Sequence, residues 1–156
     1  MEIIDFKEKE YFIEQYVHLR NSYTDLLLTS PVNIPETKEC LKKKNDIEIR
    51  GLVQDNILLG VVILYLNREG EIAFFVKKQN QGMGSRLLEI IEGVAKEKNL
   101  RSIWGWVLKE NLIAQRVFEK KGFIKEGRSE REYRGIINHG IKYKKFLLNL
   151  PHFNDR

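Results

Sequence analysis

The chain has 156 residues, the length of one domain with its own core, and we expect a single domain over residues 1–156. With 42% hydrophobic and 31% charged residues it is not a disordered chain, and no apolar run approaches the roughly 20 residues of a membrane span. One cysteine excludes an internal disulfide, and three scattered histidines lack metal-ligand spacing, so we expect no metal. The first ten residues alternate acidic and basic side chains, unlike a signal peptide, which predicts a cytoplasmic protein that binds no membrane.

The positive charge lies at one end of the sequence. Residues 101–156 hold 13 basic and 6 acidic side chains, whereas residues 1–50 hold 8 and 10. Such a basic segment indicates either an anionic partner or an ordinary solvated surface. Its aromatic residues are not interleaved with arginine and lysine as a base-stacking surface requires, so we expect no nucleic acid as a partner.

Hydrophobic periodicity predicts the first half of the fold in chain order. We expect a strand over 1–6, a helix over 9–20, a break over 26–35, a short helix over 35–44, and strands over 46–54, 57–66 and 71–76. The last three strands follow one another closely, with Asp55 and Asn56 forming the first turn, which predicts an antiparallel meander.

The second half is predicted to alternate helices and strands. A loop over 77–85 opens a helix over 84–98, which is followed by a strand over 101–108, a helix over 112–121 and a pair of strands over 123–135 and 139–150. Asn111 is a suitable N-cap for the second of these helices. The element order predicts one mixed α+β domain.

The glycine-containing turn before residue 85 is the most informative local feature. Gly82 and Gly84 follow an apolar strand and precede a helix, where several backbone N–H groups and the helix dipole can hold an anion. No Gly-Lys-Ser/Thr follows, so this is not a Walker loop, and no third glycine completes a dinucleotide fingerprint. A tight helix N-terminus without a ligand is the alternative interpretation.

Two motifs resemble those of the GNAT acetyltransferase superfamily. Residues 79–84, Gln-Asn-Gln-Gly-Met-Gly, match its Q/R-x-x-G-x-G turn, and residues 111–123 resemble N-x-x-A-x-x-x-Y-x-x-x-G-F. The predicted element order is also similar, over about residues 2–149. The resemblance implies a mixed, mostly antiparallel seven-stranded sheet with splayed central strands and about four helices. It also implies an enzyme, an N-acetyltransferase that uses acetyl-CoA as cosubstrate.

The resemblance also implies which positions bind the cosubstrate. The backbone of Phe74, Phe75 and Val76 would pair with the pantetheine arm, and an N–H there would polarise the thioester carbonyl. The pyrophosphate would be held by the N–H groups of Asn80, Gln81, Gly82, Met83, Gly84 and Ser85. Asn111 would hydrogen-bond the cosubstrate, and Ala114 and Phe118 would pack beside its pantetheine and thiol. The cations that could meet its phosphates are Lys77, Lys78, Arg86 and Arg116.

Attack of an amine on a thioester requires the amine to lose a proton. Glu71 is the candidate base because it begins the strand that leads to the glycine turn, near the place where several members of the resembling family carry a carboxylate that acts directly or through water. A surface glutamate at a strand end is an equal alternative. Phe118 stands where the family usually has tyrosine and cannot protonate a thiolate. Tyr133 or Tyr143, water, or unassisted departure of the thiolate would replace it.

Two further positions depart from the family pattern. Only two residues separate Val76 from Gln79, where four are common, which leaves the register of the turn against the pyrophosphate open. Trp106 occupies the place, five residues before the motif asparagine, where acetylases of protein N-termini often carry glutamate. This departure disfavours a protein N-terminus as the acceptor.

The resemblance implies that the acceptor is bound by the first helices with their loop and by the last hairpin, here about residues 20–36 and 124–145. The charge of the second segment indicates an anionic acceptor. Its cationic residues between 124 and 145 are Lys125, Arg128, Arg131, Arg134, Lys142, Lys144 and Lys145. A cationic wall favours a small amine that carries phosphate or carboxylate, such as a nucleotide-linked amino sugar, over a polyamine. The alternatives are an acetyltransferase of protein lysines or N-termini, and a non-catalytic acyl-CoA-binding module. A homodimer is compatible with the sequence.

Overall fold

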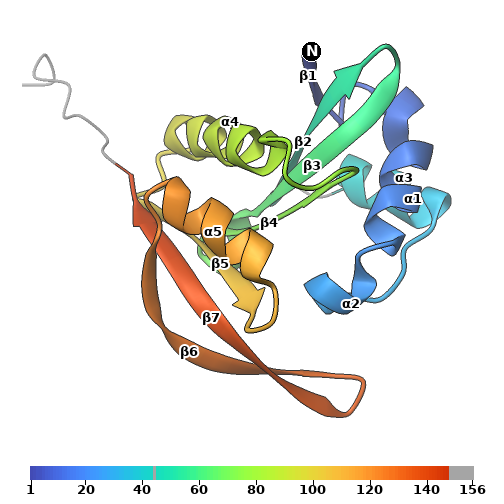
Figure 1. Ribbon diagram of the computed structural model, residues 1–156. Coiled ribbons are helices and arrows are strands. Elements are labelled where there is room, and N and C mark those ends of the chain that lie inside the picture. Colours follow the sequence, from blue (N-terminus) through green and yellow to red (C-terminus); the bar gives the residue numbers. More distant parts are fainter. Residues whose placement is uncertain (44, 148–156) are drawn as a thin grey trace, which may run out of the picture.

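The computed structural model describes residues 1–43 and 45–147, which form a seven-stranded sheet with helices on both faces (Figure 1). The strands are β1 (Glu2–Asp5), β2 (Ile47–Gln54), β3 (Ile57–Tyr65), β4 (Glu71–Val76), β5 (Ser102–Leu108), β6 (Ile124–Tyr133) and β7 (Ile136–Phe146). The α-helices are α1 (Ile13–Asn21), α2 (Thr24–Leu27), α3 (Ile34–Lys43), α4 (Met83–Glu97) and α5 (Leu112–Lys120). Short 3₁₀ turns lie at Glu10–Phe12 and Leu66–Arg68.

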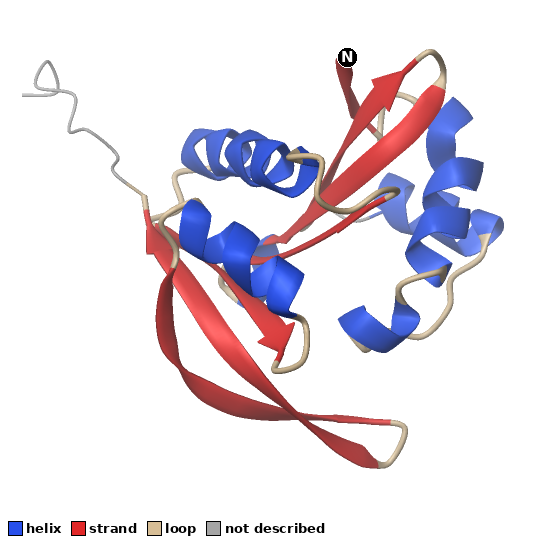
Figure 2. Ribbon diagram, viewed as in Figure 1, coloured by secondary structure: helices blue, strands red, loops and turns tan. Residues whose placement is uncertain are grey.

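The sheet has the strand order β1-β2-β3-β4-β5-β7-β6, and β4 and β5 are its one parallel pair in the described part of the chain. That pair is matched in register only at Glu71 and Trp104. Because Glu71 is the first residue of β4, the two strands separate toward the ends that carry Val76 and Leu108. The separation leaves the middle of the sheet open between two otherwise continuous antiparallel halves (Figure 2).

Side-chain alternation along β3 divides the core between the two faces of the sheet. Val62 and Leu64 belong to a cluster with the apolar residues of α4, whereas Val61 and Ile63 belong to one with those of α1. All four side chains are at most 1% exposed. The sheet is therefore the middle layer, with α4 and α5 on one face and α1 and α3 on the other.

The β6–β7 hairpin extends beyond the body of the molecule and bends beneath α2 (Figure 1). The Tyr133 hydroxyl, at the end of β6, donates a hydrogen bond of 2.7 Å to the carbonyl oxygen of Thr29, which follows α2. This contact joins the last hairpin to the first helices, 104 residues apart in sequence.

The expected α+β fold is confirmed, including the seven strands and the splayed centre. Asp55 and Asn56 form the predicted turn, both with positive φ. One detail differs from the sequence analysis. The predicted break includes the last two residues of α2, a four-residue helix too short to show periodicity, so five α-helices are present rather than about four. The parts of the predicted elements at 44 and 148–150 lie outside the described residues.

Candidate functional site

The turn between β4 and α4 is bent by left-handed backbone at two positions. Asn80 has φ 61° and Gly82 has φ 76°, and Gly82 is the N-cap of α4. A Cβ on Gly82 would meet nothing within 4 Å, so its backbone conformation rather than crowding favours glycine there. The first N–H groups of α4 have no intrahelical acceptor, and no N-cap side chain accepts a hydrogen bond from them. The turn therefore presents backbone donors at the open end of the splayed strands.

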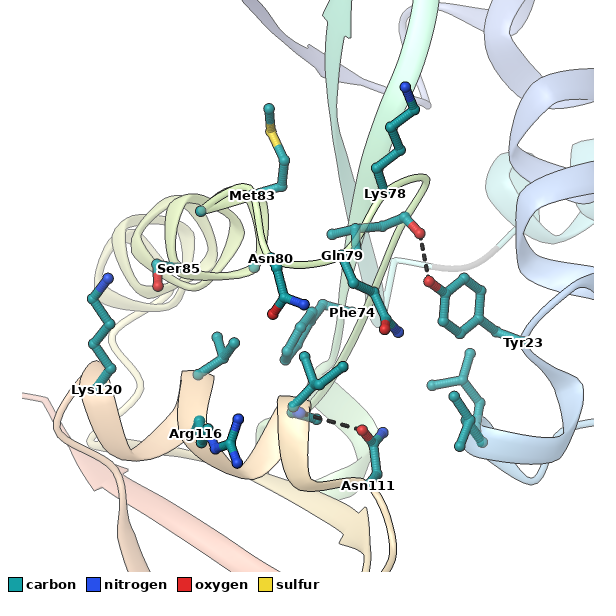
Figure 3. A pocket seen from close by; sticks show the side chains of 18 residues that line it. Tyr23, Phe74, Lys78, Gln79, Asn80, Met83, Ser85, Asn111, Arg116 and Lys120 are labelled. Atoms are coloured by element: carbon teal, nitrogen blue, oxygen red, sulfur yellow. Dashed lines mark hydrogen bonds between the residues drawn. The ribbon is translucent and has the colours of Figure 1, made fainter.

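A pocket of about 290 Å³ lies beside this turn. Three parts of the chain line it: the α1–α2 segment, the end of β4 with the turn and α4, and the first two turns of α5 with Lys120. The residues are Tyr23, Leu26, Leu27, Phe74, Val76, Lys78, Gln79, Asn80, Gly82, Met83, Gly84, Ser85, Asn111, Ile113, Ala114, Arg116, Val117 and Lys120. Figure 3 shows Phe74, Gln79 and Asn80 directed into the space between α5 and Tyr23, whereas Lys78 and Met83 point away from it.

Two hydrogen bonds fix opposite walls of the pocket (Figure 3). The Asn111 side-chain oxygen accepts from the Ala114 N–H at 3.2 Å, which is the predicted N-cap of α5. The Tyr23 hydroxyl donates to the Val76 carbonyl at 2.5 Å and ties the α1–α2 segment to the end of β4. The resemblance pointed to residues 20–36, but the sequence analysis named none of Tyr23, Leu26 and Leu27, because no local pattern links them to β4; Tyr23 and Val76 are 53 residues apart.

Three of the predicted binding residues do not line the pocket: Phe75, Gln81 and Phe118. Phe75 is 1% exposed and packs on the opposite face of the sheet, with Tyr16 and Tyr23. Gln81 is exposed in the turn. Among the predicted phosphate-binding cations, Lys78 and Arg116 line the pocket, whereas Lys77 and Arg86 do not.

Phe118 is packed behind the pocket wall and is 3% exposed. Its ring stacks on Tyr143 with centroids 5.5 Å apart and meets the edge of Phe123 at 4.9 Å. The far end of the ring lies against β5, where a Cβ on Gly105 would stand 2.5 Å from Cζ of Phe118. The motif position that is usually tyrosine is therefore a core phenylalanine here. Its Cζ atom, where a tyrosine would carry its hydroxyl, faces the backbone of β5 at Gly105.

Glu71 lies at the point where β4 and β5 part, and it is 7% exposed. Arg131 Nη2 of β6 donates to Glu71 Oε2 at 2.6 Å. Arg68 Nη1 approaches the other oxygen, Oε1, at 3.5 Å, and the Arg68 side chain is 55% exposed. Among the described residues, the carboxylate thus has one strongly bound oxygen and one oxygen whose partner is a more distant, exposed guanidinium.

The hydroxyls of the two tyrosines considered as acids are bound to protein groups. Tyr133 donates to Thr29, as described above. Tyr143 is fully buried and donates to a carboxylate oxygen of Glu119 at 2.7 Å. Burial raises the pKa of Tyr143 above its ordinary value, and the neighbouring carboxylate raises it further. Neither residue lines the pocket.

Within residues 1–43 and 45–147, the chain has neither a cluster of metal-ligating side chains nor a helix that could span a membrane. In that part of the chain, no three histidine, cysteine, aspartate or glutamate side chains gather in a group that could hold a metal ion. The helices described there are also too short or too polar to cross a membrane.

The sequence profile of the Acetyltransferase (GNAT) family matches residues 10–123, which include the splayed strands, the glycine turn and α5. The chain belongs to the GNAT acetyltransferase family. The expectation of an acyltransferase of this family is confirmed by this match. A comparison with functionally curated proteins finds no match.

Solved structures of GNAT proteins share the fold at low sequence identity. Ribosomal-protein-alanine N-acetyltransferase from Brucella melitensis has a TM-score of 0.80 and 15% identity, over 94% of this chain and all of that one. Spermidine N-acetyltransferase from Vibrio cholerae, solved with CoA and spermine, has a TM-score of 0.80 and 17% identity, over 94% of this chain and 95% of its own. An N-acetyltransferase from Staphylococcus aureus Mu50 has a TM-score of 0.80 and 16% identity, over 94% and 99%. Identities this low establish a common fold and leave the acceptor open.

Proposed function

We propose that this GNAT protein transfers the acetyl group of acetyl-CoA to a primary amine of a small anionic acceptor, by direct attack in a ternary complex. One observation carries the proposal. The pocket joins a turn rich in backbone donors to the gap between β4 and β5, so one ligand with an anionic end and an extended arm fits both. The structure of the spermidine N-acetyltransferase with CoA supports CoA as the ligand of such a fold.

The chain's own groups fit such a ligand along the whole pocket. The backbone N–H groups of the turn and of the start of α4 would bind the pyrophosphate, with Arg116 and Lys120 at the pocket for further negative charge. The edge of β4 beside Phe74 and Val76 has no strand partner within the described residues beyond Glu71. The Val76 carbonyl accepts from Tyr23, and the backbone groups of Phe74 and the Val76 N–H would pair with the pantetheine amides. When bound, acetyl-CoA supplies the activated acetyl group.

Glu71 is the proton acceptor in this proposal. Its Oε2 is held by Arg131. Oε1 has exposed Arg68 at 3.5 Å as its partner among the described residues, and it is the oxygen that would take a proton from the amine or from a bridging water. The thiolate leaves with a proton from water or without one, because Tyr133 and Tyr143 already donate to protein acceptors and Phe118 has no hydroxyl. A CoA thiol has an ordinary thiol pKa, so unassisted departure is feasible.

The cationic hairpin supports the anionic acceptor. Lys142 and Arg131 lie beside the exposed parts of Trp104 and Trp106, on the face of the sheet opposite α5. Ammonium-rich acceptors would be repelled there, whereas a phosphate or carboxylate would be attracted. A nucleotide-linked amino sugar is one acceptor with this chemistry. A protein N-terminus stays the second candidate, since the Brucella neighbour acts on ribosomal-protein alanine.

The test is thiol release from acetyl-CoA in the presence of a panel of amines, with Ser85→Asp as the variant. Aspartate in the first turn of α4 favours the helix dipole but repels a diphosphate, so the fold should survive while acetyl-CoA binding is lost. Wild-type protein at 100 times the dissociation constant should gain about 2.7 kcal/mol of stability. Gly93→Asp places the same charge on the exposed side of α4 and should keep that gain. A Ser85→Asp protein with the full gain would contradict the proposed site.

A further inference from the structure

A buried ion pair connects β4 to β6 on the face of the sheet opposite the cosubstrate pocket. Glu71 is almost fully enclosed, and its bond to Arg131 is 2.6 Å long, within the range of a strong charge-assisted hydrogen bond. Arg131 is different, because 34% of its side chain is exposed. In this pair the carboxylate is therefore buried, whereas the guanidinium is accessible to solvent.

Two tryptophans hold that guanidinium in place. The guanidinium carbon of Arg131 lies 4.8 Å from the ring centroid of Trp106 and 5.8 Å from that of Trp104. Trp106 is fixed in turn, since its indole N–H donates to Ser129 Oγ at 2.8 Å and its ring covers Gly140, where a Cβ would stand 2.2 Å from Cζ2. Arg131 is thus an oriented group rather than a mobile surface side chain.

Most of the hydrogen-bonding capacity of Arg131 is unused. A guanidinium has five N–H donors. Across residues 1–43 and 45–147, Glu71 Oε2 is the one acceptor bonded to it. A preorganised arginine that keeps free donors, in a partly exposed position, suits bidentate binding of a planar carboxylate or a phosphate.

The surrounding groups favour an anion over a cation. Lys142 Nζ lies 4.6 Å from the Trp104 centroid, and the Arg68 guanidinium lies 4.1 Å from the Tyr65 centroid. The aromatic faces that could attract a cationic ligand therefore already hold cations of the protein. A polyamine would have to displace them, whereas an oxyanion would add a counter-charge to four cations that share Glu71 and Glu126: Arg68, Arg131, Lys142 and Lys144.

We propose that Arg131 selects acceptors that carry an oxyanion, carboxylate or phosphate, within a few bonds of the reacting amine. This inference rests on the proposed function and gives its acceptor a recognition residue. Because Arg131 and Glu71 are in direct contact, an anion on the guanidinium brings a nearby amine to the carboxylate. Glu71 then positions Arg131 as well as receiving the proton.

The experiment compares matched amines in the acetyl-CoA assay: ethanolamine with O-phosphoethanolamine, propylamine with β-alanine, and glucosamine with glucosamine 1-phosphate. Wild-type protein should favour the anionic member of at least one pair by tenfold or more in kcat/KM. Arg131→Met should remove that preference by raising KM for the anionic member about 10–100-fold, the value of a hydrogen bond to a charged group. Because Arg131 also holds Glu71, the substitution should lower kcat for both members of a pair, and the KM of the member without the oxyanion should change less than threefold. The phosphate and carboxylate pairs distinguish the two sources of the anion.

Two further variants keep the test decisive. Arg131→Lys retains the charge and should restore part of the preference even if the methionine variant is unstable. Arg128→Met makes the same change on the same strand, at an exposed position, and should leave the preference intact. Activity on amines without any preference, or an equal loss for both members of a pair in Arg131→Met, would overturn the inference alone. Inactivity of wild-type protein on every amine would overturn the proposed function and this inference with it.

Discussion

Gly105→Ala tests the packing that separates the cosubstrate pocket from the core. The added Cβ would lie 2.5 Å from Cζ and 2.9 Å from Cε1 of Phe118. The φ of Gly105 is not in the left-handed region, so alanine meets no backbone strain and the contact alone sets the cost. The ring cannot retreat, because it is 3% exposed and stacked on Tyr143 at an interplanar angle of 10°. We expect a loss of about 1–3 kcal/mol in the free energy of unfolding.

A second substitution distinguishes this clash from a general weakening of β5. Phe118→Ala alone removes a buried ring and should cost about 3–5 kcal/mol. It also vacates the space that the alanine at 105 needs. The double variant should therefore be more stable than the sum of the two losses, by about 1–3 kcal/mol.

Urea denaturation of the wild type, the two single variants and the double variant gives the four free energies, provided that their m values agree. Gly93→Ala is the control, since Gly93 lies in α4 with open space around its Cα, and alanine there should add up to about 1 kcal/mol of stability. Losses that add within about 0.5 kcal/mol would refute the direct contact between Gly105 and Phe118.

Two other substitutions give independent tests. Phe118→Tyr should change turnover by less than about tenfold, or 1.4 kcal/mol, because the new hydroxyl would enter the core beside β5 instead of the pocket; a large gain of activity measured by thiol release would contradict this. Burial alone would raise the pKa of Glu48, but its bonds to Lys7 at 3.1 Å and Arg50 at 2.9 Å outweigh burial, and the pKa is lowered below 4.5. The ionised Glu48 therefore stabilises the fold above its ordinary pKa of 4.5, and this stabilisation is lost as the pH falls through the lowered pKa of the folded state. Glu48→Gln should cost about 2 kcal/mol at pH 7 and flatten the decline in stability below pH 4.5, as measured by urea denaturation across pH. If the free energy of unfolding of Glu48→Gln falls with decreasing pH as steeply as that of the wild type, other carboxylates cause the loss of stability in acid.

The sequence predicted the secondary structure well where a side-chain period ran over enough residues. The strand over 71–76 was placed at its observed bounds, and the helix after the glycine turn within one residue, because both carry long apolar patterns. The four residues of α2 span barely one helical turn, which is too short for a period to be visible. Their position follows instead from tertiary contacts, such as the bond between Thr29 and Tyr133.

The candidate site was predictable in its backbone and less so in its side chains. The glycine turn and the Asn111 cap are local features, and the structure contains both. The motif could not indicate which side of α5 the ring of Phe118 takes, because that depends on the absence of a side chain at Gly105 on another strand. Nor could it indicate that Glu71 is held by Arg131, which lies 60 residues later.

The splayed centre gives the sheet four edges instead of two, and the chain protects them in different ways. The outer edge β6 alternates charges of both signs and is interrupted by a bulge between Lys125 and Gly127, features that discourage another strand from adding to it. The inner edge of β4 carries Ala73, Phe74 and Phe75, which offer no such charge. Its protection depends on what fills the gap: the α1–α2 segment tied to Val76 by Tyr23, and the pantetheine arm of the proposed cosubstrate. Occupancy of the pocket should therefore also keep the protein from aggregating. Depletion of acetyl-CoA would leave the inner edge of β4 free to pair with strands of other molecules.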